Sequence, residues 1–186
     1  MGLFYSVSDK KLLEAKNKIF VSKGLNALKV NGFERSPYKG ELFGKNNLGD
    51  YTYSLCRLNS NSHLECIETH ITKGDTWIKI FLNIFQLTPT VKTLEELKGL
   101  DGMQFFLIPN SKTRMRLRTD DFEGAPLFRS TEHRLKSFYS ESGFHKRAEE
   151  LSELIENDLN NIDSFIKRWH ELHRPMVTNW EGKKIE

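Results

Sequence analysis

The sequence of 186 residues contains only two cysteines, no apolar run that approaches the roughly 20 residues of a membrane span, and no secretory signal pattern. Two thiols cannot build the disulfide framework of a small secreted domain, and no C-x-x-C pair offers a metal or redox site. We therefore expect a cytoplasmic protein without membrane attachment, in which Cys56 and Cys66 stay reduced and pack on neighbouring strands. Abundant Asn and Lys beside few Ala and Val are typical of AT-rich coding and indicate a bacterial source.

The sequence also lacks a strong excess of charge of one sign. The 28 Lys and Arg residues stand against 25 Asp and Glu residues, which gives a net charge of +3 and a pI of about 8.8. A nucleic-acid-binding domain usually carries a dense basic footprint and a pI above about 9. This composition leaves nucleic acid as a minority alternative to a protein partner.

The sequence contains near matches to catalytic and metal-binding motifs, but none has the spacing that its motif requires. The glycines of Gly40–Lys45 enclose three residues, whereas a phosphate-binding loop needs four. His170 and His173 are three residues apart, one short of the zincin spacing, so we expect no metal, with these two histidines as the nearest candidates. No nucleophile elbow is present either. The motifs therefore favour a non-catalytic protein without a cofactor.

The first half of the chain predicts a helix followed by a sheet. Apolar residues recur at helical spacing from Ser8 to Asn31, with a bend expected at Gly24. Residues 33–87 then change to short runs of Tyr, Thr, Ile and Phe that are separated by glycines. This pattern predicts an antiparallel meander of about four strands.

The hairpin at Gly74 is specific enough to predict its register. A two-residue Gly-Asp turn pairs Ile71 with Ile78, Thr69 with Ile80 and Ile67 with Leu82, which makes one face aliphatic. The opposite face then carries the mixed set Glu68, His70, Trp77, Lys79, Phe81 and Asn83.

The second half predicts a further hairpin and a helical end. A capping box at Thr93–Glu96 opens a short helix, and residues 103–108 and 113–118 have the composition of two paired strands. An apolar stripe from Phe144 to Trp169 predicts a long amphipathic helix that breaks near residues 157–161.

Together these elements predict one α+β domain over residues 1–175, with a short flexible tail at 176–186. Its antiparallel sheet has about five to six strands, a meander plus a hairpin. An N-terminal helix and a long, broken C-terminal helical segment pack against this sheet.

Two surfaces are candidates for binding. Arg114, Arg116 and Arg118 alternate with Met115 and Leu117, so they share one face of a predicted strand at intervals of about 6.6 Å. A charged edge strand that blocks sheet association is the alternative interpretation.

The mixed hairpin face is the second candidate, because Trp77, Lys79 and Phe81 have the composition of protein interfaces. Burial of this face under a helix is the alternative.

These features favour a cytoplasmic binding protein for an acidic protein partner. A toxin-neutralising or accessory role is one form of this hypothesis, by analogy of architecture only. One alternative is an enzyme that uses Glu68 and His70, or Asp120 and Asp121, as acid and base in a pocket between sheet and helix.

A second alternative is a nucleic-acid-binding module. It would use the three arginines of the 113–118 strand together with Tyr51 and Tyr53 as a stacking surface.

Overall fold

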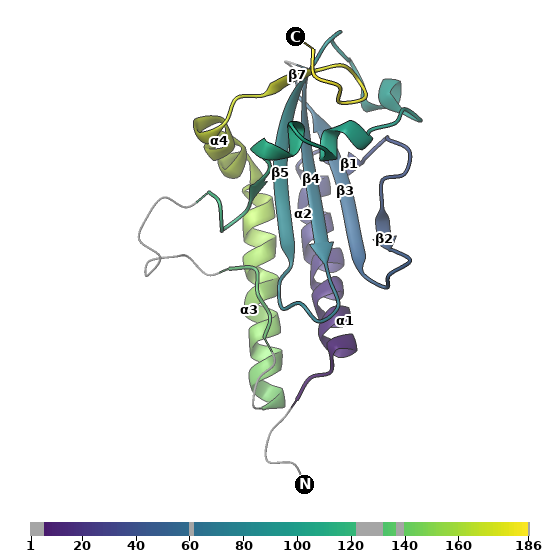
Figure 1. Ribbon diagram of the computed structural model, residues 1–186. Coiled ribbons are helices and arrows are strands. Elements are labelled where there is room, and N and C mark those ends of the chain that lie inside the picture. The colour runs from purple at the N-terminus through teal and green to yellow at the C-terminus, as the bar shows by residue number, and fades with distance from the viewer. Residues whose placement is uncertain (1–5, 60–61, 122–131, 137–139, 186) are drawn as a thin grey trace.

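The computed structural model describes residues 6–59, 62–121, 132–136 and 140–185. These residues form a seven-stranded sheet with long helices on one face and short helical turns on the other (Figure 1). The α+β class that the sequence predicts is confirmed. No described helix is long and apolar enough to cross a membrane.

Three long antiparallel strands form the centre of the sheet: β3 (Tyr51–Leu58), β4 (His63–Ile71) and β5 (Lys79–Leu87). Two short strands share each outer edge. On one side β1 (Glu34–Arg35) and β2 (Phe43–Lys45) pair with β3. On the other side β6 (Met115–Arg116) pairs antiparallel, and β7 (Met176–Thr178) parallel, with β5.

The predicted register of the β4–β5 hairpin is confirmed, since Thr69 lies opposite Ile80 and Ile67 opposite Leu82. The predicted turn is wrong. The turn hydrogen bond runs from the Asp75 amide to the Thr72 carbonyl (3.3 Å), so Gly74 is the third residue of a four-residue turn. Its φ of +77° suits glycine at that place.

A buried lysine explains this connection. Lys16 is fully buried, and its ammonium group donates hydrogen bonds to the carbonyls of Thr72, Asp75 and Trp77. A buried charge requires such acceptors. The loop therefore curls around the ammonium group instead of closing tightly.

The N-terminal helix is continuous, with a π-helical turn that ends at Gly24, where the sequence predicts a bend. It consists of α1 (Asp9–Ile19), a π-helical turn (Phe20–Gly24) and α2 (Leu25–Val30). A Cβ on Gly24 would lie 2.7 Å from the Phe20 ring, so this close contact requires glycine. Gly32, with φ of +80°, follows the helix end.

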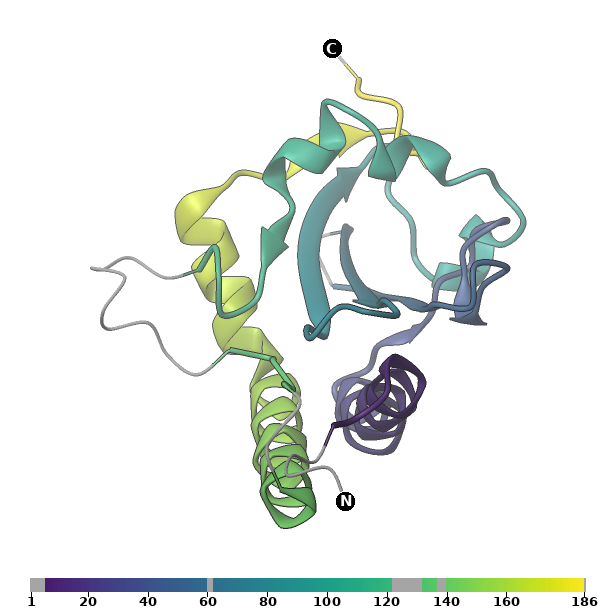
Figure 2. The same cartoon turned by 60° about the horizontal axis from the view of Figure 1, so that its bottom comes forward.

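The C-terminal helical segment is α3 (Glu141–Asn160) and α4 (Ile162–Leu172), with the predicted break at Asn161. Figure 2 shows α1, α2 and α3 side by side under one face of the sheet. The predicted apolar stripe is buried there, namely Phe144, Leu151, Ile155, Leu159, Ile162, Ile166 and Trp169.

The opposite face of the sheet, called the outer face below, is covered over one half only. Three 3-10 turns cross it: η2 (Leu94–Leu97), η3 (Met103–Phe106) and η4 (Asn110–Thr113). They bury a second apolar cluster around Cys56, Leu64 and Phe85. The predicted capping box at Thr93 and Glu96 is present at η2.

The predicted strand at 103–108 is wrong, and so is the hairpin built on it. Local bonds from the Phe105 amide to the Gly102 carbonyl and from the Leu107 amide to the Gln104 carbonyl make this segment a helical turn. A short apolar run does not distinguish a strand from a helix by periodicity. The helical turn places the centre of the Phe105 ring 4.7 Å from that of Phe85 and 5.2 Å from that of Tyr38. We infer that these contacts select the turn over the strand.

The flexible tail expected after Pro175 is also wrong for its described part. Residues 176–178 form β7, and the Trp180 indole donates a hydrogen bond to the Pro89 carbonyl at 2.7 Å. Beyond β6, the edge of β5 would otherwise leave backbone groups without partners. The chain end supplies them.

Candidate functional site

The open half of the outer face brings together several residues that the sequence singles out. Phe81 of β5 lies at its centre, and the Arg114 guanidinium group stacks 3.6 Å from the centre of its ring. Glu68 of β4 forms an ion pair with Arg114 at 3.0 Å and contacts His70 Nε2 at 2.9 Å. No helix of the described chain crosses this half, and η3 borders it where Met103 and Phe106 line a pocket with Glu68 and His70.

The electrostatics hold Glu68 as a carboxylate. Burial opposes its ionisation, but hydrogen bonds and charge from His70 and Arg114 keep the pKa of Glu68 below its ordinary value. Glu68 is therefore an ion-pair partner within the site.

Trp77 forms a second cluster beside the first. Arg116 lies 4.3 Å and Arg134 5.0 Å from the Trp77 ring centre. Arg134 is placed by an antiparallel bridge to Trp77, and its Nε donates to the Thr76 hydroxyl at 2.9 Å. Neither guanidinium group forms an ion pair with any described residue. Two cations thus share one indole, and the charges of Asp120, Glu132 and Asp75 act on Arg116 from beyond ion-pair distance.

The remaining arginine, Arg118, points into the protein. Its φ of +59° ends the alternation of the strand, and its guanidinium group pairs with Asp158, a residue of α3 that is 2% exposed. His133 binds the same carboxylate at 2.7 Å. Of the three predicted arginines, only Arg116 keeps an unpaired guanidinium group at the surface.

Of the other predicted binding residues, Lys79 lies beside this cluster, and Tyr51 and Tyr53 lie apart from it. Lys79 pairs with Asp75 at 2.7 Å on the outer face. Tyr53 is buried on the helix side, where its hydroxyl donates to Asn17 at 2.6 Å, and Tyr51 packs beside the same core. The two tyrosines therefore face away from the arginines.

The candidate acids Asp120 and Asp121 shape a turn. Asp120 accepts a hydrogen bond from the Arg116 amide at 2.8 Å. One carboxyl oxygen of Asp121 is buried without a partner, and burial raises the pKa of this residue. Neither residue lines a pocket with Glu68.

The candidate metal ligands lie at the end of α4. The ring of His170 lies 5.9 Å from His63, and that of His173 lies 5.4 Å from Trp169. Among the residues that the structure describes, no three His, Cys, Asp or Glu side chains gather in a way that suits a metal ion.

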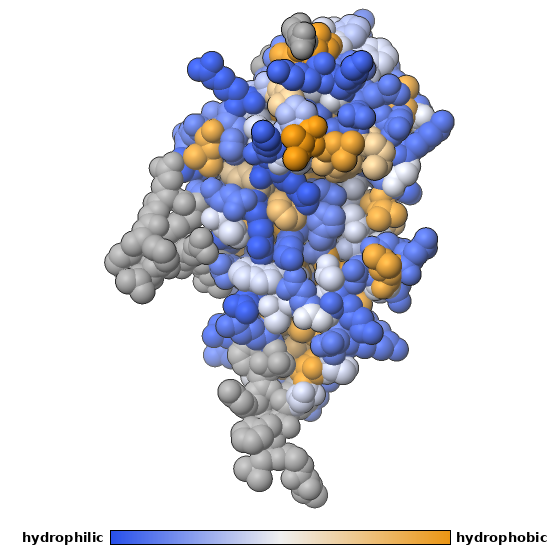
Figure 3. All heavy atoms as spheres, viewed as in Figure 1, coloured by the Kyte–Doolittle hydropathy of each residue, from blue (hydrophilic) through white to orange (hydrophobic). Residues whose placement is uncertain are grey.

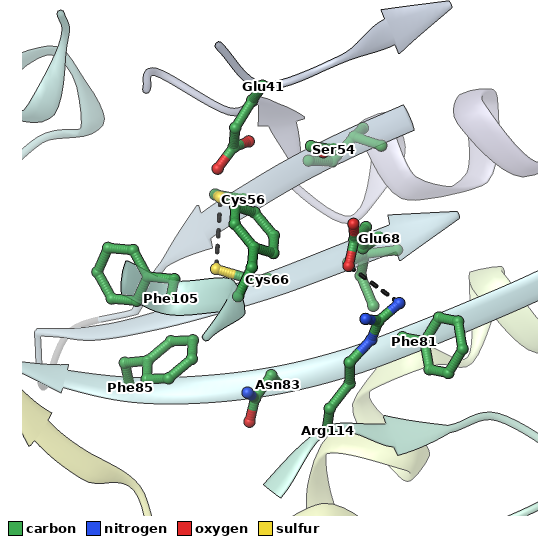
Figure 4. Close-up of a pocket in the computed structure, with 13 residues that line it drawn as sticks. Glu41, Ser54, Cys56, Cys66, Glu68, Phe81, Asn83, Phe85, Phe105 and Arg114 are labelled. Carbon is green, nitrogen blue, oxygen red and sulfur yellow. Dashed lines mark hydrogen bonds and ion pairs between the residues drawn. The ribbon is translucent and has the colours of Figure 1, made fainter. Parts of the chain in front are cut away.

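A narrow pocket lies between the outer face and η3 (Figure 4). Cys56 and Cys66 form part of its floor as directly paired residues of β3 and β4, with their sulfur atoms 3.5 Å apart. The side chain of Glu41 points toward them from the β1–β2 connection. Burial raises the pKa of Glu41 to about 7; the Ser36 hydroxyl opposes this shift and the charge of Glu68 adds to it.

Exposed apolar side chains continue from this pocket to the surface. Met103, Leu107 and Ile108 are 52%, 48% and 74% exposed. Figure 3 shows apolar atoms gathered over this helical segment on the outer face. An apolar rim thus adjoins the polar groove of Glu68 and His70.

Sequence reasoning missed two functional candidates, Arg134 and Glu41. Both lie in irregular segments without periodicity. Arg134 reaches Trp77 through a bridge between residues 57 positions apart, and such pairing leaves no local signal. The Gly40 and Gly44 pattern around Glu41 indicated only a turn.

Fold and site together define an α+β protein with one sheet face closed by helices and the other half open, charged and aromatic. No protein-family model, curated protein or solved structure matches this chain.

Proposed function

We propose that this chain is a non-catalytic binding protein that recognises an acidic surface of a protein partner through Trp77, Arg116 and Arg134. The observation that carries the proposal is the pair of guanidinium groups on one indole, without a carboxylate partner among the described residues. Arginine and tryptophan dominate the energetics of protein interfaces. We place this activity in the cytoplasm.

The chemistry of the cluster supports a carboxylate as the group recognised. Each guanidinium group offers several N–H donors in a fixed plane, which suits Asp and Glu side chains. Stacking on Trp77 holds both groups in place before a partner arrives, so less side-chain entropy is lost on binding.

A protein partner is favoured over nucleic acid. Arg114 and Arg118 are engaged by Glu68 and Asp158 inside the chain, and Tyr53 is buried. Few cations remain for the many phosphate contacts that sustain nucleic-acid affinity.

The test uses incorporation of a photo-crosslinking amino acid at Lys79, beside the cluster, in the native host. The same amino acid at Val30, which is 83% exposed on α2, is the control. We expect a discrete protein adduct from position 79 only, including after nuclease treatment. An adduct lost with nuclease would instead identify nucleic acid.

With the partner purified, the double variant Arg116→Glu/Arg134→Glu tests the role of charge. We expect slower association and a weaker dependence on salt, with unchanged melting, because interface charges act mainly on association. Arg174→Glu, the control, reverses one charge at an exposed arginine of the C-terminal segment, half the charge change of the double variant. Equal association rates for wild type and the double variant would refute the proposal.

A further inference from the structure

The pocket under η3 has two parts with different dimensions. Its inner end, between the paired cysteines, Phe85 and Phe105, holds a volume of about 30 Å³, room for about two water molecules. Its mouth, lined by Leu42, Met103 and Phe106 among others, holds about 160 Å³. Glu41, Ser54, Glu68 and Phe106 line both parts. A ligand with a small head and a slender chain fits this shape.

The lining holds two acids, Glu41 and Glu68, and two cations, Lys39 and Arg114, and one of the acids forms no ion pair. Glu68 is satisfied by Arg114 and His70, as described above. Glu41 forms no ion pair in the described chain, and its Oε2 is buried without a hydrogen-bond partner. A buried carboxyl group without a partner is costly, so a ligand that supplies donors and positive charge is favoured here.

The apolar part of the lining suits the same kind of ligand. Four phenylalanines surround the pocket, namely Phe81, Phe85, Phe105 and Phe106. Aromatic faces attract ammonium and guanidinium groups. Arg114 already occupies the Phe81 ring, which demonstrates this contact within the site.

We propose that the pocket binds an organic cation of the alkylguanidinium or alkylammonium class. The charged head lies beside Glu41, which lines both parts, and the alkyl chain leaves through the mouth between Leu42 and Met103. This site is separate from the Trp77 cluster and does not depend on the proposed partner.

The proposal implies a defined pH dependence. The cation requires the carboxylate form of Glu41, and the pKa of Glu41 is raised to about 7, so affinity increases about tenfold from pH 6 to pH 8. The other titratable or charged groups around Glu41 are Lys39, Glu68, His70, Arg114, Cys56, Cys66 and Tyr38. Burial raises the pKa of Tyr38, and the Cys56 hydrogen bond with burial raises that of Cys66, so both stay neutral in this range.

The experiment is calorimetric titration of the full chain with n-butylguanidinium, n-butylammonium and the neutral n-butylurea. We expect one cation to bind per chain, with n-butylurea at least about tenfold weaker. Glu41→Gln keeps the shape of the side chain and removes its charge. This substitution should weaken cation binding about tenfold or more, because a hydrogen bond to a charged group contributes more free energy than a tenfold change in Kd requires.

Two variants serve as controls. Glu95→Gln removes an acid whose side chain is 75% exposed, and it should leave binding unchanged. His70→Asn should retain the rise in affinity from pH 6 to pH 8, which separates Glu41 from the neighbouring histidine. Thermal melting of each variant verifies folding.

Three results would overturn the proposal. These are equal binding of n-butylurea and n-butylguanidinium, unchanged affinity in folded Glu41→Gln, and no binding of either cation at millimolar concentration. The crosslinking experiment at position 79 does not depend on any of these results.

Discussion

Replacing Asp158 by asparagine tests how much the buried ion pair of Asp158 with Arg118 stabilises the fold. The Asp158 carboxylate is 2% exposed and receives hydrogen bonds from Arg118 and His133. Asparagine keeps its volume but removes the carboxylate charge that pairs with the Arg118 guanidinium group, which is itself only 19% exposed. Breaking one side of a buried ion pair costs about 3–5 kcal/mol. For a chain of this length the melting temperature should fall by about 6–20 °C.

The pH dependence of this loss has a defined sign. Burial would raise the pKa of Asp158, but the Arg118 and His133 bonds hold it below its ordinary value. A carboxyl group with a lowered folded pKa stabilises the protein above its unfolded pKa, and this stability is lost as the pH falls through the folded pKa. The free energy of unfolding of the wild type should therefore fall below about pH 4. The difference in this free energy between the wild type and Asp158→Asn should become smaller there.

Urea denaturation of wild type and Asp158→Asn at neutral and acidic pH measures both effects. Asp163→Asn is the control, because Asp163 binds Arg57 at 2.6 Å but its side chain is 71% exposed. Such an exposed pair contributes about 0–1 kcal/mol. A loss for Asp158→Asn no larger than that of Asp163→Asn would refute the reasoning. The double variant Arg118→Met/Asp158→Leu should lose less than Asp158→Asn, since no unpaired charge remains.

Three further predictions concern the core, a glycine contact and the buried lysine. Ile80→Ala should cost about 2–5 kcal/mol in chemical denaturation, and a loss below about 1 kcal/mol would contradict its central place in the core. Gly182→Ala should destabilise more than Gly49→Ala: both have φ of +86°, but only at Gly182 does a new Cβ fall 2.7 Å from the Phe105 amide. Equal melting temperatures of these two variants would exclude the contact as the cause. Burial lowers the pKa of Lys16 to about 8, so the folded state releases the Lys16 proton at a lower pH than the unfolded state. The free energy of unfolding of the wild type should therefore rise between about pH 8 and 10.5. Lys16→Met should lack that rise when urea denaturation is measured across the same range.

Local periodicity was sufficient for the parts of the fold that depend on neighbouring residues. The pairing of Thr69 with Ile80 follows from alternation within one hairpin, because a shift of one residue would bury Glu68 and His70. The break at Asn161 follows from the mostly polar sequence at residues 157–161 within one apolar stripe. Each inference needed only a short stretch of chain.

Elements that depend on distant partners were not predictable in this way. Residues 176–178 have no strong strand pattern, and they become a strand because the edge of β5 beyond β6 is vacant. Met103–Phe106 has the composition of a strand but folds as a turn over Phe85. In both cases the conformation is chosen by tertiary contact.

The candidate site shows the same division. Alternation correctly places Met115 and Leu117 in the core and Arg116 toward the outer face. It fails at Arg118, whose left-handed backbone turns the side chain toward the interior. No sequence pattern could predict that turn, because the buried carboxylate that stabilises it lies 40 residues away.

The half-open outer face follows from the path of the chain. After β5 ends at Leu87, the segment of η2, η3 and η4 crosses the Phe85 half of this face and enters β6 opposite Phe81 and Leu82. β6 therefore reaches the sheet before the described segment has covered the other half. There Phe81 and Trp77 are shielded by arginine side chains instead of apolar ones. Because a guanidinium group covers an aromatic ring and still presents donors, the arrangement that protects these rings also creates the surface proposed to bind an acidic partner.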